Sequence, residues 1–256
     1  MVVTGATVKN YRERMSAINK AAAEAVQQYL AAHNFDIDDA FIDFAHSLTT
    51  LYGEAASALA CQMYDELHEY WKASKGIQKR IYPAEPAPVP TRSQVEKSVY
   101  GTLKVSSEQI AGAVQRLVKQ TAEDTTLKNA IRDGAEWAWI PAGDTCAFCI
   151  MLGSRGWQKQ SKKALKNGHA QHIHANCDCT YMVRFNDNLY VEGYEPEEYK
   201  EMYDDADPGG SREDKLNAMR RDAYAKNKDE INAQKLSNYE KRKEREESSA
   251  EEIKVD

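Results

Sequence analysis

The sequence has no apolar run approaching the roughly 20 residues that a transmembrane helix needs. It also has no excess of basic residues, because 34 Lys and Arg stand against 40 Asp and Glu, a formal net charge of −6. The chain as a whole therefore lacks the positive surface of a typical nucleic-acid-binding protein. No internal repeat is found. The charged fraction of 29% and the mean hydropathy of −0.71 instead indicate an elongated or helix-rich molecule with much solvated surface.

Cysteine is scarce and unevenly distributed, since four of the five cysteines fall between residues 144 and 179. Cys146 and Cys149 form a C-x-x-C pair. His174, Cys177 and Cys179 form H-x-x-C-x-C, which begins 25 residues later (174 − 149). Zinc takes four nitrogen or sulfur ligands in tetrahedral geometry, often as two chelating pairs on tight turns. The pattern predicts one structural zinc per chain and leaves open which four of the five donors bind it.

Other residues and other chemistries compete with this zinc site. His169 and His172 are weaker candidate ligands. A C-x-x-C pair can be a redox site, but that motif opens a helix after a βαβ unit, and no such unit surrounds Cys146. Disulfides are less favoured because the N-terminal residues do not resemble a signal peptide, so we expect a reducing compartment. The fifth cysteine, Cys61, lies beside an apolar helical stripe and is predicted to be a core residue.

The first 82 residues have the periodicity of helices. Apolar residues recur at three- and four-residue steps from Tyr11 to Tyr29, and again from Phe41 to Trp71. Asp36 or Asp38 can cap the second helix, and Gly53 marks a point at which that helix can divide. We expect an N-terminal helical hairpin or bundle. It retains apolar surface for docking to a partner, because so few helices bury little by themselves.

The middle of the chain combines a proline-rich segment, further helices and short strands. Residues 83–90 hold four of the seven prolines and are predicted to form an extended, polyproline-like linker. Capping-box patterns begin helices after Thr91 and Ser106. Two short strands, 137–140 and 180–185, flank the cysteine pairs. Two short strands are marginally stable alone, so a zinc ion that clips them together would supply the missing stability.

The predicted fold is therefore mainly α. It has an N-terminal helical docking region (1–82), a proline-rich linker (83–90), a region of helices with a zinc-clipped α+β module (91–205), and a charged C-terminal helix and tail (206–256). Opposite charges alternate in that last region, which is typical of a solvated helix packing along a thin seam.

The ordered motifs of the central region resemble the Mu F-like family, the minor capsid or head-morphogenesis proteins of tailed bacteriophages. The matching residues are Trp139, Gly143, Asp144, Cys146, Phe148, Cys149, Ser154–Gly156, His174, Cys177, Cys179, Thr180 and Glu192–Tyr194. Many relatives have a proline and a basic residue where this chain has Ala175 and Asp178. The lost positive charge removes support for a phosphate contact there.

The resemblance implies a structural virion protein without enzymatic activity. It implies partnership with the phage portal protein, the major capsid protein or both, and it leaves open a contact with packaged DNA. The implied location is the capsid interior near the portal, after assembly in the host cytoplasm, with a role in head assembly or genome delivery. Two alternatives are an HNH-type phage nuclease, for which His172, His174 and Asn176 supply the residue types, and an adaptor that tethers DNA or the portal.

Overall fold

The computed structural model describes residues 2–76, 82–104, 109–143, 145–159, 177–185 and 190–233, together with 235–237, 239, 240 and 243. Its helices are α1 (Gly5–Ala32), α2 (Asp39–Lys75), α3 (Arg92–Leu103), α4 (Ile110–Asp133), α5 (Ala147–Gly153), α7 (Pro196–Asp205) and α8 (Arg212–Lys226). Its strands are β1 (Val2–Val3), β2 (Glu136–Ile140), β3 (Gln158–Lys159), β4 (Thr180–Arg184) and β5 (Tyr190–Val191). The predicted class, mainly helical with a small sheet, is confirmed.

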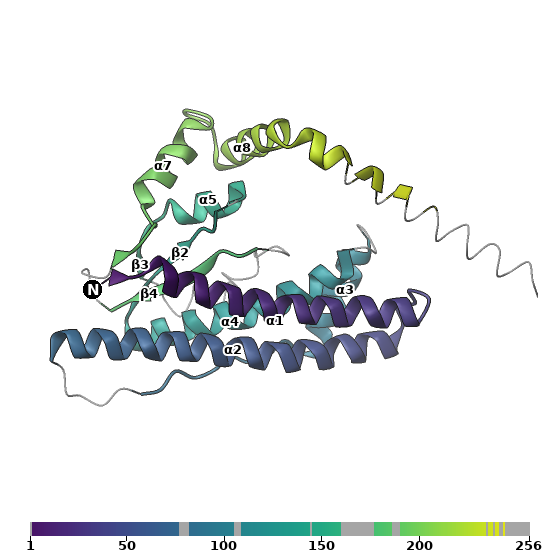
Figure 1. Cartoon of the computed structure of the whole chain (residues 1–256), viewed down its shortest axis with the longest axis horizontal. Coiled ribbons are helices and arrows are strands. Elements are labelled where there is room, and N and C mark those ends of the chain that lie inside the picture. Colours follow the sequence, from purple (N-terminus) through teal and green to yellow (C-terminus); the bar gives the residue numbers. More distant parts are fainter. Residues whose placement is uncertain are drawn as a thin grey trace, which may run out of the picture.

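The helices α1 and α2 form a long antiparallel hairpin (Figure 1). Asp38 caps α2, since its carboxylate accepts a hydrogen bond of 2.8 Å from the backbone N–H of Phe41. The predicted division at Gly53 is wrong, because α2 runs unbroken through it. A β-carbon at Gly53 would lie 3.4 Å from both Thr121 on α4 and Val89 in the proline-rich segment. The glycine thus allows close packing of three segments.

Helix α4 occupies the centre of the molecule. It packs against α1, α2 and α3 through one core cluster and against β2 and β4 through its C-terminal half. Most of its faces are covered, so its sequence shows only a weak apolar stripe. Because α4 touches both the hairpin and the sheet, it connects the two parts of the core.

The sheet that carries the cysteine-rich region is antiparallel, with strand order β3-β2-β4. The register pairs Trp137 with Val183 and Trp139 with Tyr181. Both main strands match the predicted ones to within a residue at either end. A second, parallel pair joins β1 to β5, and beside it the carboxylate of Glu192 accepts the N–H of Gly5 at 2.7 Å.

Helices α5, α7 and α8 cover one side of this sheet in Figure 1. Leu216 and Ala218 of α8 are buried, and α8 packs against α5 and α7. The predicted charged C-terminal helix therefore exists as α8, and the chain after residue 243 lies outside the described residues. None of the described helices is long and apolar enough to span a membrane.

The proline-rich segment is extended, as predicted, but it is also fixed along part of its length. The backbone N–H groups of Ala84, Glu85 and Ala87 donate to Asp65, Asn129 and Thr125, at 2.8, 2.9 and 2.9 Å. Its carbonyls accept from cationic or amide groups on α4, which are Asn129, Lys128 and Arg132. Residues 82–87 are therefore bound to α2 and α4 by hydrogen bonds. The domain boundaries at residues 82, 90 and 205 stay predictions.

Asn129 offers a test of this attachment. Its fully buried side chain both donates to and accepts from the backbone of Glu85. Asn129→Ala would leave those backbone groups without partners, so we expect a loss of about 1–3 kcal/mol in the free energy of unfolding, measured with urea. Lys128→Ala removes an exposed bond to the same segment and should cost less than about 1 kcal/mol. Equal losses for both variants would contradict a structural role for the buried amide.

Candidate metal centre

Three cysteines meet where β2, β4 and α5 converge. Cys149 lies in α5, whereas Cys177 and Cys179 lie just before β4. Their sulfur atoms all lie within 4.8 Å of one another. The three residues are 1%, 5% and 3% exposed. The fold therefore brings together three of the five residues that the sequence predicted as zinc ligands.

The fourth cysteine joins them through the geometry of a helix start. Cys146 is the N-cap of α5, and Cys149 is the third residue after it. An N-cap side chain lies over the third helical position, which is why serine or threonine there bonds back to the helix. The same geometry turns the C-x-x-C pair inward, and the Cys146 thiol hydrogen-bonds with that of Cys149. Cys149 consequently has the other three cysteines around it.

The spacing of the sulfurs suits a tetrahedral zinc. The Cys149 and Cys177 sulfurs are 3.6 Å apart. Two thiolates each about 2.3 Å from a tetrahedral zinc would be separated by roughly 3.8 Å. A disulfide needs about 2.0 Å, so this pair is not one. The donor set and its spacing therefore fit zinc or a similar thiophilic ion.

The remaining candidate ligands, His169, His172 and His174, lie outside the described residues. The choice of four ligands among Cys146, Cys149, His174, Cys177 and Cys179 accordingly stays a prediction. Cys61 is half-buried on α2, away from the cluster.

Charge is unevenly shared among the clustered thiols. Cys179 interacts with the thiols of Cys149 and Cys177 and accepts a hydrogen bond from the N–H of Ala142 at 3.2 Å, and these contacts lower the pKa of its thiol. Hydrogen bonding with Cys146 and Cys177 raises the pKa of Cys149. A second thiolate in so small a space would be repelled by the first, and a bound divalent cation would remove that repulsion.

Two buried charged residues of α4 hold the second cysteine pair. Lys119 Nζ donates to the carbonyl oxygen of Cys177. Glu123 accepts from the Tyr181 N–H at 3.0 Å and from the Thr180 hydroxyl at 3.1 Å. Lys119 and Glu123 are 4% and 0% exposed. Sequence reasoning missed both, because a Lys and a Glu four residues apart on a helix usually form an exposed ion pair.

The first cysteine pair is held from other directions. Arg12 of α1 donates to the carbonyls of Ile140 and Pro141, both at 2.8 Å, and so fixes the end of β2. The Tyr194 hydroxyl donates to the Gly153 carbonyl at 2.8 Å and fixes the end of α5. A β-carbon at Gly153 would lie 2.6 Å from Pro141, so only glycine fits there. The centre is thus braced by α1, α4, β2 and the turn after β5.

Burial of Glu123 predicts a pH effect on stability. Burial raises the pKa of this carboxyl to about 7, so the folded protein retains a proton there that the unfolded chain has lost. The resulting stability is present below the unfolded pKa and is lost as pH rises to about 7. We expect wild type to lose up to about 3 kcal/mol more than Glu123→Gln between those pH values, in parallel urea titrations. Identical pH profiles for the two proteins would rule this out.

Comparison with known proteins identifies a family. A family model described as VG15 protein matches residues 2–206, which is 205 of the 256 residues (206 − 2 + 1). The chain therefore belongs to this family, a family of phage proteins. No curated protein and no solved structure matches the chain.

Proposed function

We propose that this phage protein of the VG15 family is a structural minor component of the phage head. It would lie in the capsid interior near the portal and act in head assembly or genome delivery. The ordered motifs around its cysteine pairs, which resemble the Mu F-like head-morphogenesis proteins, support this role. Its membership of a phage family agrees with it.

The observation that carries the structural role is the closure of the metal centre. Cys149, Cys177 and Cys179 are almost completely buried, and Cys146 or His174 would supply the fourth ligand. A catalytic zinc keeps one position for water or substrate, whereas a structural zinc has four protein ligands. We infer that the ion is zinc, that it stabilises the fold, and that the protein is not an enzyme.

The closed centre makes a prediction about metal content. Freshly purified, reduced protein should hold about one zinc per chain by elemental analysis. Cys149→Ala should lose the zinc and lower the melting temperature, because metal binding and local folding are coupled. Cys61→Ala is the matched control, since Cys61 lies outside the cluster, and it should keep the zinc.

Comparing Cys146→Ala with His174→Ala would identify the fourth ligand. The variant that loses zinc marks the residue that binds it. Reduced wild-type protein without zinc would refute the metal assignment.

A nuclease is the main alternative to a purely structural role. Its candidate catalytic residues, His172, His174 and Asn176, lie outside the described residues. Plasmid DNA incubated with the protein and magnesium should stay intact. Cleavage that disappears in His172→Ala or His174→Ala while zinc is retained would favour the nuclease.

Location in the particle is the direct test of the proposed role. Quantitative mass spectrometry of purified particles should find the protein in few copies, and a pull-down should recover it with the portal. Cys149→Ala should be depleted from particles, and Cys61→Ala should be packaged normally. Absence of the wild-type protein from particles would overturn the role.

The docking region predicted in residues 1–82 stays a prediction. Of the apolar residues expected there, Phe41 is fully buried in the core and Leu51 is 60% exposed. Removing residues 1–82 would also uncover α4, which packs against α1 and α2. Point substitutions therefore test this surface better than a deletion does.

A further inference from the structure

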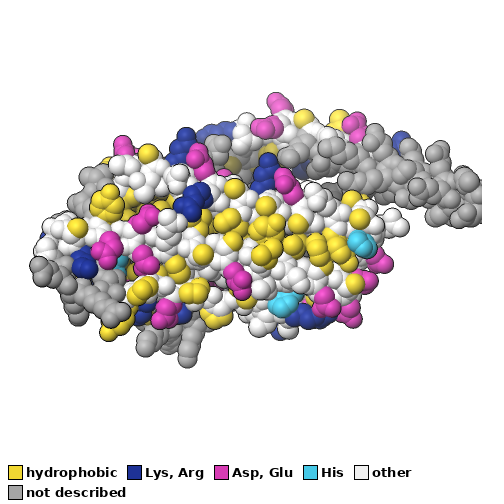
Figure 2. Space-filling view, turned by 60° about the horizontal axis from the view of Figure 1, so that its bottom comes forward, with side chains coloured by type: hydrophobic (Ala, Val, Ile, Leu, Met, Phe, Trp, Pro, Cys, Tyr) yellow, Lys and Arg dark blue, Asp and Glu magenta, His cyan; other side chains and the backbone are white. Residues whose placement is uncertain are grey.

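The outer face of the α1–α2 hairpin carries a continuous apolar surface, which we call the outer strip. It consists of Ala17, Ala21 and Ala25 on α1 and Phe44, Leu48, Leu51 and Ala55 on α2, all exposed or partly exposed. Figure 2 shows a band of apolar side chains over this face. A contiguous apolar patch marks an interaction surface, whereas single exposed apolar residues need no explanation.

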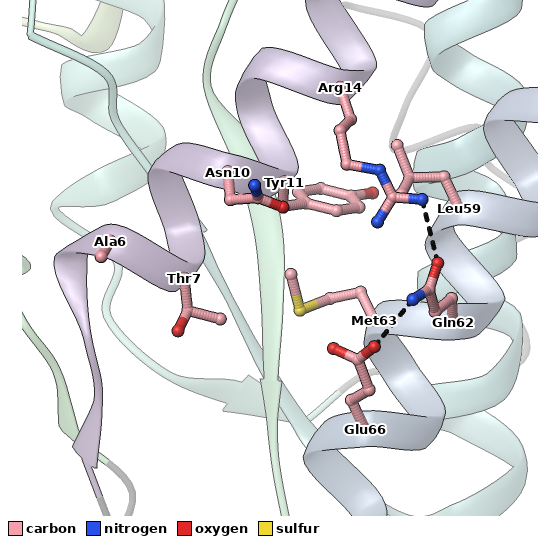
Figure 3. Close-up of a pocket in the computed structure, with 9 residues that line it drawn as sticks. All are labelled: Ala6, Thr7, Asn10, Tyr11, Arg14, Leu59, Gln62, Met63 and Glu66. Atoms are coloured by element: carbon pink, nitrogen blue, oxygen red, sulfur yellow. Dashed lines mark hydrogen bonds between the residues drawn. The ribbon is translucent and has the colours of Figure 1, made fainter.

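The outer strip ends at a polar pocket of about 330 Å³ between α1 and α2 (Figure 3). Arg14 donates to Gln62 at 3.0 Å, and Gln62 donates to Glu66 at 2.8 Å. These side chains therefore already bond to one another across the pocket rim. The apolar strip, rather than this pocket, is the part of the face that a partner would cover.

The two helices have a fixed register along the strip. The rings of Tyr29 and Phe44 stack with their centroids 4.1 Å apart. At the other end Arg14 bonds to Gln62. Because α1 and α2 are antiparallel, a residue of α1 and a residue of α2 lie side by side when their numbers add up to a nearly constant sum. The two contacts put that sum at about 73 to 76 (29 + 44 = 73; 14 + 62 = 76). Ala25 is consequently level with the turn from Leu48 to Leu51 (25 + 48 = 73; 25 + 51 = 76), and Ala21 with Ala55 (21 + 55 = 76).

The two sides of the outer strip differ in side-chain size, and this difference makes the strip complementary to a second copy of itself. Its α1 side holds only alanines, and its α2 side holds the large residues Phe44, Leu48 and Leu51. A two-fold axis along the helices would place α1 of one copy over α2 of the other. Each pair of leucines would then lie on the alanines of the opposite copy, as ridges fit into grooves.

The charges beside the strip agree with the same arrangement. Lys20 on α1 and Glu54 on α2 are exposed and level with each other (20 + 54 = 74). Lys20 also lies 3.8 Å from Glu24 of its own helix, in an exposed pair that contributes little by itself. The two-fold axis would bring Lys20 of each copy to the side of Glu54 of the other. Opposite charges at the rim of an interface favour the correct register over others.

We propose that the outer strip is the interface of a homodimer, in which two α1–α2 hairpins form a four-helix bundle. The interface is separate from the metal centre and does not depend on the proposed role in the head. A portal or capsid protein on the same strip is the competing occupant, and it predicts a monomer in solution.

The first test is the oligomeric state of the full chain by sedimentation equilibrium at about 10 µM. Wild type should be a dimer. Leu51→Glu should weaken it about 100-fold, because each dimer loses two buried leucines. Leu236→Glu is a matched control, since Leu236 is 58% exposed against 60% for Leu51 and lies outside the strip. A monomeric wild type, or a dimer unaffected by Leu51→Glu, would overturn the proposal.

A size swap tests the pairing itself. Ala25→Leu should clash with the opposite Leu51 and weaken the dimer about 10-fold or more. The double variant Ala25→Leu, Leu51→Ala restores the summed volume and should recover most of that affinity. Ala225→Leu, at an exposed position of α8, should have no effect. A double variant weaker than Ala25→Leu alone would exclude this pairing, because the two side chains would then not meet across the axis.

Discussion

The contact of α4 with the segment that carries Cys177 and Cys179 into β4 is the constraint on which the rest of the structure depends. Lys119 and Glu123 bury an ammonium and a carboxyl group at this contact, and both form hydrogen bonds with backbone or hydroxyl groups beside the cysteines. A buried charge without a partner is costly, so the strand has one favourable position against the helix. That position sets the spacing of the sulfurs. The candidate metal centre is therefore shaped by a helix that contributes none of its candidate ligands.

The same helix connects the metal centre to the hairpin. Its C-terminal half packs on the sheet, and its other faces meet α1, α2 and the proline-rich segment. Arg12 makes a second connection, from α1 to the end of β2. Loss of order at the cysteines would thus remove packing from the helices as well. The proline-rich segment, predicted as an extended linker, also bonds to both α2 and α4.

Local patterns in the sequence predicted the parts of the fold that depend on local signals. The apolar periodicity from Tyr11 to Trp71 revealed the hairpin, and the β-branched and aromatic runs beside the cysteines revealed β2 and β4. The C-x-x-C and C-x-C spacings identified the three cysteines that the fold clusters and the fourth at the start of α5. Each of these signals lies within a few residues of the structure it predicts.

The features that were missed depend on partners distant in the sequence. Strands β1, β3 and β5 are two residues long, which is too short for a periodicity. Nothing near Asn129 indicates that it binds Glu85, 44 residues away. From the sequence alone Gly53 was predicted to divide a helix. Its actual role depends on close packing against Thr121 and Val89, which come from other segments of the chain. In each case the deciding contact is tertiary, and the sequence around the residue does not encode it.

The pairing of β1 with β5 has a consequence for how the chain folds. Gly5 and Glu192 are 187 positions apart, yet their hydrogen bond satisfies the start of α1. During synthesis α1 emerges well before Glu192, so the N-terminal turn of α1 lacks this acceptor until residue 192 has left the ribosome. Contacts between such distant residues carry a loop-closure cost and form late. The N-terminal turn of α1 should therefore be among the last parts of this fold to reach its final structure.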